Sequence, residues 1–120
     1  MKQVLIVEDS PTELHILTSI MEKHGFTVTV ANNGLEAIDK VKTSHPDIIL
    51  MDVVMPEMNG FKATRTLKKD DSSSHIPIIM VTTKAQETDR VWAMRQGVDA
   101  YLNKPVDEKE LMKTVNELMT

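Results

Sequence analysis

The stretch VLIVEDSPTELHIL occupies residues 4–17 and contains one complete unit of the pattern that the rest of the chain follows. It opens with a short apolar run rich in β-branched residues, which is typical of a strand covered on both faces. Glu8 and Asp9 come directly after it. Ser10 and Pro11 then suit the N-cap and first position of a helix, and leucines recur beyond them at helical spacing. The stretch predicts a strand, an acidic turn and an amphipathic helix.

The same alternation continues to the end of the chain. Further apolar runs lie at residues 28–30, 48–51, 78–81 and 100–102. Helices are expected from Pro11 to Gly25, after the turn at Asn33-Gly34 that leads into Leu35, Ile38 and Val41, after Asn59-Gly60, from about Gln86 to Gln96, and after Pro105 with Asp107 as N-cap. Lys68-Lys69 and Asp70-Asp71 are expected to form a solvated helix end and loop. Repeated strand-then-helix units imply right-handed crossovers and an open parallel sheet, a doubly wound α/β fold.

Composition limits the classes of protein. A chain of 120 residues with 41% hydrophobic residues fits one domain, residues 1–120, with no effector domain attached. The absence of cysteine excludes disulfides and thiolate metal sites, and together with the lack of a leader or membrane-spanning run it favours a cytoplasmic location. A net charge of −4 without a basic stripe argues against nucleic acid as a direct partner.

Polar residues that could bind a ligand or take part in a reaction lie at the ends of four of the five predicted strands. Glu8 and Asp9 follow the first, Asp52 the third, Thr82 ends the fourth, and Lys104 follows the fifth. In a parallel sheet all of these positions emerge at one edge, where ligands of doubly wound folds bind. Each alone is more simply a helix cap or a solvated charge, but their joint occurrence indicates a site.

Clustered carboxylates repel one another and favour a bound cation. The cluster offers only oxygen ligands, which suits Mg²⁺. Asp52 can then act as the nucleophile toward a phosphoryl group and form an acyl phosphate. The ammonium of Lys104 and the hydroxyl of Thr82 would interact with the phosphoryl oxygens.

The motifs resemble those of bacterial response-regulator receiver domains, the chemotaxis-regulator family with the flavodoxin-like (βα)5 fold and strand order 2-1-3-4-5. The resemblance covers the whole chain. The residues that carry it are VEDS at 7–10, MDVVMPEMNG at 51–60, VTT at 81–83 and KP at 104–105.

The resemblance implies a role for each site residue. Asp52 is the phospho-acceptor, and Asp9 and Asp52 bind Mg²⁺ with the backbone carbonyl of Val54, while Glu8 contributes through water. Thr82 and Tyr101 form the switch pair. Lys104 pairs with the phosphoryl oxygens, and the Lys104–Pro105 peptide bond is cis. The phosphodonor is a histidine kinase, and the readout face is formed by the fourth helix, fifth strand and fifth helix.

A narrower likeness links the run from Val81 to Trp92 and the segment from Lys104 to Glu108 with stand-alone regulators of type IV pilus twitching motility, the PilH type. It implies a chemotaxis-like kinase and pilus movement as output, through a protein partner that the sequence does not identify. Apolar Val54 and bulky Thr83 beside Asp52 lead us to expect an acyl phosphate that is not lost unusually fast. We expect a monomer, with weak dimerisation on phosphorylation left open.

Other functions were weighed against this one. An aspartyl-nucleophile phosphatase would carry a second acid where Val54 stands, and an electron carrier of flavodoxin type would carry a glycine- and hydroxyl-rich loop after the first strand. The main alternatives are a phosphorylation-independent interaction domain and a phosphate sink. In either case the chain is expected not to be an enzyme beyond its own phosphoryl transfer and dephosphorylation. For Trp92, packing and partner contact are both open.

Overall fold

The computed structural model describes residues 2–55, 58–84 and 86–120. Strands and helices alternate along the chain in the order β1 (Gln3–Val7), α1 (Pro11–Lys23), β2 (Thr27–Ala31), α2 (Gly34–Ser44), β3 (Ile48–Met51), α3 (Gly60–Lys69), β4 (Ile78–Thr82), α4 (Glu87–Gln96), β5 (Ala100–Asn103) and α5 (Glu108–Leu118). The predicted elements are therefore all present. Motif residues Pro56, Glu57 and Ala85 lie outside the described residues.

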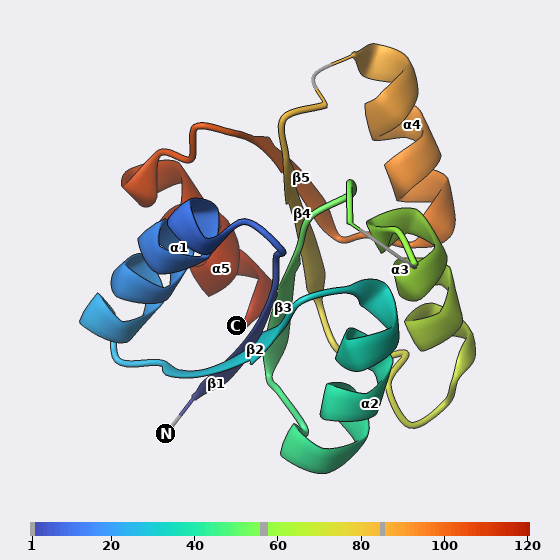
Figure 1. Cartoon of the computed structure of the whole chain (residues 1–120), viewed down its shortest axis with the longest axis horizontal. Coiled ribbons are helices and arrows are strands. Elements are labelled where there is room, and N and C mark those ends of the chain that lie inside the picture. Colours follow the sequence, from blue (N-terminus) through green and yellow to red (C-terminus); the bar gives the residue numbers. More distant parts are fainter. Residues whose placement is uncertain (1, 56–57, 85) are drawn as a thin grey trace.

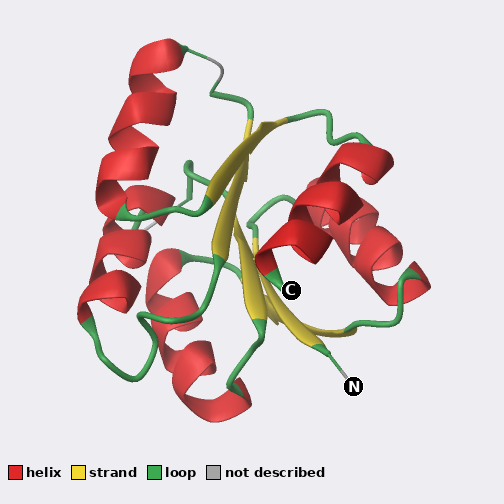
Figure 2. Ribbon diagram, turned by 180° about the vertical axis from the view of Figure 1, so that it is seen from behind, coloured by secondary structure: helices red, strands yellow, loops and turns green. Residues whose placement is uncertain are grey.

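The five strands form one sheet in the order β2-β1-β3-β4-β5, and every neighbouring pair is parallel. Both the doubly wound fold and the strand order implied by the family resemblance are confirmed. The sheet runs through the centre of the molecule with helices on both sides (Figures 1 and 2). The chain reverses its direction of winding at β1, so β2 and β3 lie on either side of that strand.

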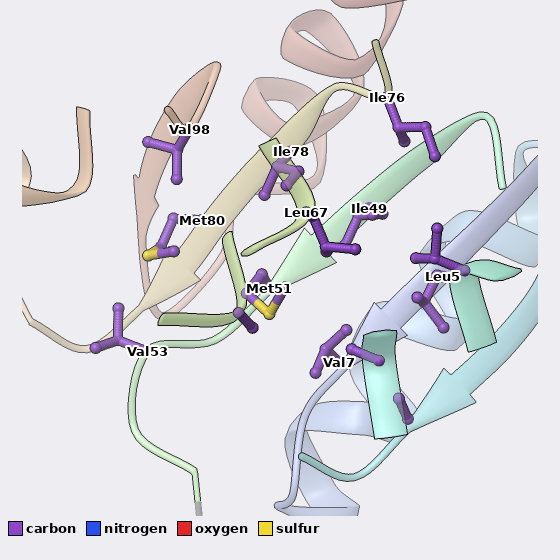
Figure 3. Packing of buried hydrophobic residues seen from close by; sticks show 14 of the residues in the cluster. Leu5, Val7, Ile49, Met51, Val53, Leu67, Ile76, Ile78, Met80 and Val98 are labelled. Carbon is purple, nitrogen blue, oxygen red and sulfur yellow. The ribbon is translucent and has the colours of Figure 1, made fainter. Parts of the chain in front are cut away.

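Alternate side chains of the strands supply two separate cores. On one face Val4 and Ile6 pack with buried residues of α1 and α5, including Leu17 and Leu111. On the other face Leu5 packs with side chains from α2, α3 and α4, and Figure 3 shows part of this cluster around β1, β3 and β4. Because β1, β3 and β4 are covered on both faces, they are nearly unbroken apolar runs in the sequence.

Capping side chains set the start of four helices. Ser10, Asn33, Asn59 and Asp107 each accept a hydrogen bond from a backbone N–H of the first turn of α1, α2, α3 and α5. α4 begins at Glu87, and its N-cap residue, Gln86, makes no such bond. These caps fix where each helix leaves the sheet edge, which in turn fixes the loops that carry the polar site residues.

One expectation from the sequence is wrong. Lys68 is not at a solvated helix end: its side chain is 18% exposed, and its Nζ lies 3.0 Å from Asp99 Oδ2 and donates to the carbonyl of Ile76 at 2.8 Å. The error arises because its partners are distant in the sequence. On α2 the helix packs through Ala37 and Val41, while Leu35 is 46% exposed.

Candidate functional site

The acidic residues meet because β1 and β3 are neighbours in register. Val7 pairs with Met51, so the residues that follow each strand lie side by side at the carboxyl edge. The amide of Asp52 donates to the carbonyl of Val7 at 3.0 Å, which ties the start of one loop to the end of the adjacent strand. The topological reversal at β1 places this point where doubly wound folds bind ligands.

Glu8, Asp9 and Asp52 form a compact carboxylate cluster. One oxygen from each lies within 4.8 Å of the others. Glu8 is 1% exposed and Asp52 is 8% exposed, whereas Asp9 is open to solvent. The predicted acids are therefore brought together, with Asp9 on the outer side, and Val54 lies in the loop that leaves Asp52.

Lys104 enters the same cluster from β5. Its amide donates to the carbonyl of Thr82 at 2.9 Å, and the following peptide bond to Pro105 is cis, as the resemblance implies. The ammonium group donates a hydrogen bond to Glu8 and lies 3.6 Å from Asp52 Oδ2. A buried cation thus balances part of the charge of the buried acids.

The surroundings change the proton affinity of both partners. Burial raises the pKa of Glu8, although hydrogen bonds from Lys104 and from the amide of Ser10 act in the opposite direction. Burial also tends to lower the pKa of Lys104, but the hydrogen bond to Glu8 and the charge of Asp52 outweigh it and raise that pKa. Lys104 is consequently a permanent cation at neutral pH.

The backbone around Asp52 is held by the start of α3. The Oδ1 of Asp52 accepts a hydrogen bond from the amide of Val53 at 2.7 Å, and the carbonyl of Val53 accepts one from the amide of Gly60 at 2.9 Å. A Cβ at position 60 would lie 2.0 Å from the carbonyl oxygen of Asp52. The loop between β3 and α3 can therefore close only around a glycine.

Thr82 and Tyr101 belong to β4 and β5, the two strands that follow β3 in the sheet. Thr82 is fully buried, and its Oγ1 accepts from the amide of Lys84 at 3.3 Å. The hydroxyl of Tyr101 donates to the carbonyl of Lys84, which also accepts from Asn103 Nδ2 at 3.0 Å. Burial and the nearby carboxylates of Asp89 and Asp52 raise the pKa of Tyr101.

Comparison with known protein families finds one that matches nearly the whole chain. Residues 4–116 match the family model described as response regulator receiver domain. The chain belongs to the response-regulator receiver domains. Receiver domains act in two-component signalling, where they receive phosphate from histidine kinases and bind Mg²⁺ in the active site.

The receiver domain has close relatives of nearly equal length. It is 54% identical to Protein PilH from Pseudomonas aeruginosa over 119 residues, which cover 99% of this chain and 98% of that protein. A receiver domain of a signal transduction histidine kinase from Syntrophus aciditrophicus superposes with a TM-score of 0.92 at 35% identity, covering 99% of this chain and 90% of the other.

Another similar structure bears on the acidic cluster. The receiver domain of a sensor histidine kinase from Pseudomonas aeruginosa PAO1, which holds a magnesium ion in its active-site cleft, has a TM-score of 0.91 and 29% identity, covering 98% of this chain and 97% of the other.

Within the described part of our receiver domain, no helix is long and apolar enough to cross a membrane.

Sequence reasoning missed two contacts of this receiver domain. The direct ion pair between Lys104 and Glu8 joins residues 96 positions apart, and only the final arrangement of β1 and β5 reveals it. The bond from Asn103 to the carbonyl of Lys84 likewise depends on how the loop after β4 packs beside β5. No local pattern marks Asn103, because an asparagine at a strand end is usually a turn residue.

Proposed function

We propose that this receiver domain is a switch operated by phosphorylation of Asp52. The observation that carries the proposal is the cluster of Glu8, Asp9 and Asp52 within 4.8 Å, with the Lys104 ammonium 3.6 Å from Asp52. A buried carboxylate next to a fixed cation is suited to attack a phosphoryl group. The domain then catalyses only its own phosphoryl transfer and dephosphorylation, and it turns over no metabolite.

The residues of the cluster suit a magnesium ion. All donors are oxygens, which Mg²⁺ prefers, and the exposed position of Asp9 leaves room for water and a phosphoryl oxygen. Asp9 and Asp52 would hold the ion with the backbone carbonyl of Val54, and Glu8 would contribute through water. When bound, the ion supplies positive charge that neutralises phosphoryl oxygens.

The transfer step follows from the positions of the side chains. An oxygen of Asp52 forms a bond to phosphorus while the P–N bond to the histidine of the kinase breaks, and the imidazole leaves. Lys104 stands beside Asp52 to stabilise the charge on the transferred group. Thr82 ends the adjacent strand and would donate its hydroxyl to a phosphoryl oxygen. The same oxygen accepts a hydrogen bond from the amide of Lys84, so a reorientation of Thr82 would alter that bond.

The output is proposed to pass through Tyr101 and the face formed by α4, β5 and α5. Tyr101 and Thr82 are linked through the backbone of Lys84, since one bonds its carbonyl and the other its amide. A movement of Thr82 would therefore shift the backbone of Lys84 and alter its hydrogen bond with Tyr101. The 54% identity to Protein PilH supports a stand-alone regulator of type IV pilus twitching motility with a chemotaxis-like kinase as phosphodonor.

Intact-mass measurement tests the phosphorylation. The parent protein and an Asp52→Asn variant would be incubated with Mg²⁺ and acetyl phosphate. We expect an adduct of about 80 Da, one phosphoryl group, on the parent alone. An unmodified parent that also fails to bind beryllofluoride would favour an interaction domain that works without phosphorylation.

The lifetime of the adduct tests the effect of Val54 and Thr83: loss of the phosphoryl group within seconds would contradict slow dephosphorylation.

The twitching role needs a cellular test. Replacing the chromosomal gene with the Asp52→Asn variant should change the twitching zone to the same extent as deleting the gene. A variant that alters the α4-β5-α5 face but accepts phosphate separates signalling from a phosphate sink: normal twitching with such a variant would favour the sink.

A further inference from the structure

A second concave surface lies away from the acidic cluster, between α3 and α4. The two helices lie side by side (Figure 1), and a hollow of about 230 Å³ opens between them. We call it the α3–α4 groove; it is lined by Asn59, Phe61, Lys62, Arg65, Trp92 and Gln96. The groove shares α4 with the face proposed above for output, but its lining includes no residue of β5 or α5.

Each helix contributes one aromatic side chain to the groove. Trp92, the only tryptophan of the chain, is 48% exposed although it is the largest side chain available for packing. Phe61 lies opposite on α3 and is only partly covered by the core. Tryptophan at the centre of an interface contributes more binding energy than most other residues when a partner covers it. The volume of the groove suits one large apolar side chain placed between these rings.

The floor of the groove holds an unused hydrogen-bond acceptor. Gln96 is 9% exposed, and its Nε2 donates to the carbonyl of Trp92 at 3.4 Å. Within the described residues its carboxamide oxygen has no hydrogen-bond partner. This oxygen is accessible to solvent, because Thr64 Oγ1 is the one fully buried side-chain polar atom of the described residues that has no partner. It is therefore free to accept a hydrogen bond from a backbone N–H of a bound peptide.

The charged side chains of the groove are all basic. Lys62 and Arg65 are exposed, and no carboxylate of residues 2–55, 58–84 and 86–120 lies within ion-pair distance of either. α3 carries four basic residues and no acid. The acids of α4, Glu87 and Asp89, are in its first turn, and neither lines the groove. In a chain with a net charge of −4, this is a local reversal of sign.

We propose that the α3–α4 groove binds an acidic segment of a partner protein. The segment inserts one large apolar side chain between Phe61 and Trp92, places acidic residues against Lys62 and Arg65, and donates a backbone N–H to Gln96. The basic side chains favour an acidic occupant. The hollow between Phe61 and Trp92, which has room for about one side chain, and the free acceptor of Gln96 favour a peptide over a nucleic acid or an anionic membrane. The proposal does not depend on phosphorylation of Asp52.

Selection from a displayed library of random peptides tests it. Peptides would be selected on the parent protein and counter-selected on a Trp92→Ala variant. We expect sequences with one large apolar residue flanked by Asp or Glu. Their binding should shift the emission of Trp92 to shorter wavelength and weaken as salt is raised. Binding of dye-labelled peptides should weaken at least tenfold in Arg65→Glu, while Lys113→Glu, an equal charge change at an exposed site on α5, should leave it unchanged.

Three results would overturn the proposal. The library could return no peptide that depends on Trp92. The selected peptides could lack acidic residues and bind Arg65→Glu as well as the parent. Sedimentation could show that the parent self-associates through Trp92, in which case a second copy occupies the groove. Unfolding midpoints of each variant, measured beside the parent, ensure that lost binding is not lost folding, and both charge reversals are at exposed positions.

Discussion

Glycines at two positions of this chain are required for different physical reasons, and the difference can be measured. At position 60 a Cβ would meet the carbonyl oxygen of Asp52 at 2.0 Å, which is far inside van der Waals contact. At position 25 nothing lies within 4 Å, but the backbone has a φ of +88° that side chains with a Cβ disfavour. The first glycine permits close packing, and the second permits a left-handed turn at the end of α1.

Gly60→Ala should therefore lower the free energy of unfolding by about 3 kcal/mol or more, because backbone must move and the loop carrying Asp52 moves with it. Gly25→Ala, the control, should cost only about 1 kcal/mol, the steric penalty of the left-handed conformation. Urea unfolding checks both values. Equal losses in the two variants would show that the contact at Asp52 relaxes easily.

At the scale of elements, Lys68 joins the end of α3 to the start of β4 and β5. Its ammonium donates to the carbonyls of Ser74 and Ile76 and to Asp99, whose carboxylate in turn accepts from the amide of Ile78 at 2.8 Å. Lys69, its neighbour, is exposed and forms no ion pair among the described residues. Adjacent lysines thus offer a matched comparison of a structural and a solvated charge.

Lys68→Met should lower the unfolding free energy by about 1–2 kcal/mol. A fully buried hydrogen bond of a charged group would contribute more, but Asp99 is partly exposed and water weakens its interaction with the lysine. Lys69→Met should change it by less than about 0.5 kcal/mol. Guanidinium unfolding of the two variants gives the comparison. A Lys68→Met variant as stable as Lys69→Met would mean that the loop before β4 holds its position without the lysine.

A second tie between elements depends on pH. Hydrogen bonds from His24 and Lys23, at the end of α1, lower the pKa of Glu108 at the start of α5 below its ordinary value of 4.5. A carboxyl whose pKa is depressed by folding stabilises the protein above the unfolded-state value and loses that contribution as the pH falls through the folded-state pKa. The tie should thus be present at neutral pH and vanish in acid.

The stability difference between the parent and Glu108→Gln should accordingly favour the parent at about pH 6 and disappear near about pH 3. Thermal unfolding across this range checks the sign. Glu110→Gln is the control, because it removes an exposed acid from the same first turn of α5. A difference that persists at low pH would assign the effect to packing of the side chain instead of its charge.

For the whole molecule, the sequence predicts the fold well because the three inner strands, β1, β3 and β4, are buried on both faces. A run such as Ile48–Met51 can be apolar throughout only in a sheet with helices on either side, and the acids at strand ends then fall at one edge. What escapes prediction are contacts that depend on pairing across the sheet. Lys68 meets Asp99, and Lys104 meets Glu8, only after β1, β4 and β5 have taken their places.

The site itself opposes folding in one respect. Glu8, Asp9 and Asp52 bring three carboxylates within 4.8 Å, and Lys104 supplies one cation for them. At neutral pH the cluster carries excess negative charge that the unfolded chain would keep apart. A divalent cation that binds the folded state would offset this repulsion and add its own binding free energy to the stability. Metal affinity and fold stability are thus linked through the exposed member, Asp9.

Asp9→Asn should therefore raise the unfolding free energy by about 1 kcal/mol in EDTA, because one of the repelling charges is gone. In Mg²⁺ the order should reverse: the parent gains about 2.7 kcal/mol at a concentration 100 times its dissociation constant, and the variant, lacking a ligand, gains far less. Asp39→Asn removes an exposed acid on α2 and should respond to Mg²⁺ as the parent does. Urea unfolding of all three proteins in both buffers measures this. If Mg²⁺ stabilised Asp9→Asn as much as the parent, the ion would not be bound through Asp9, whereas the reversed order would tie the repulsion within the cluster to its use as a cation site.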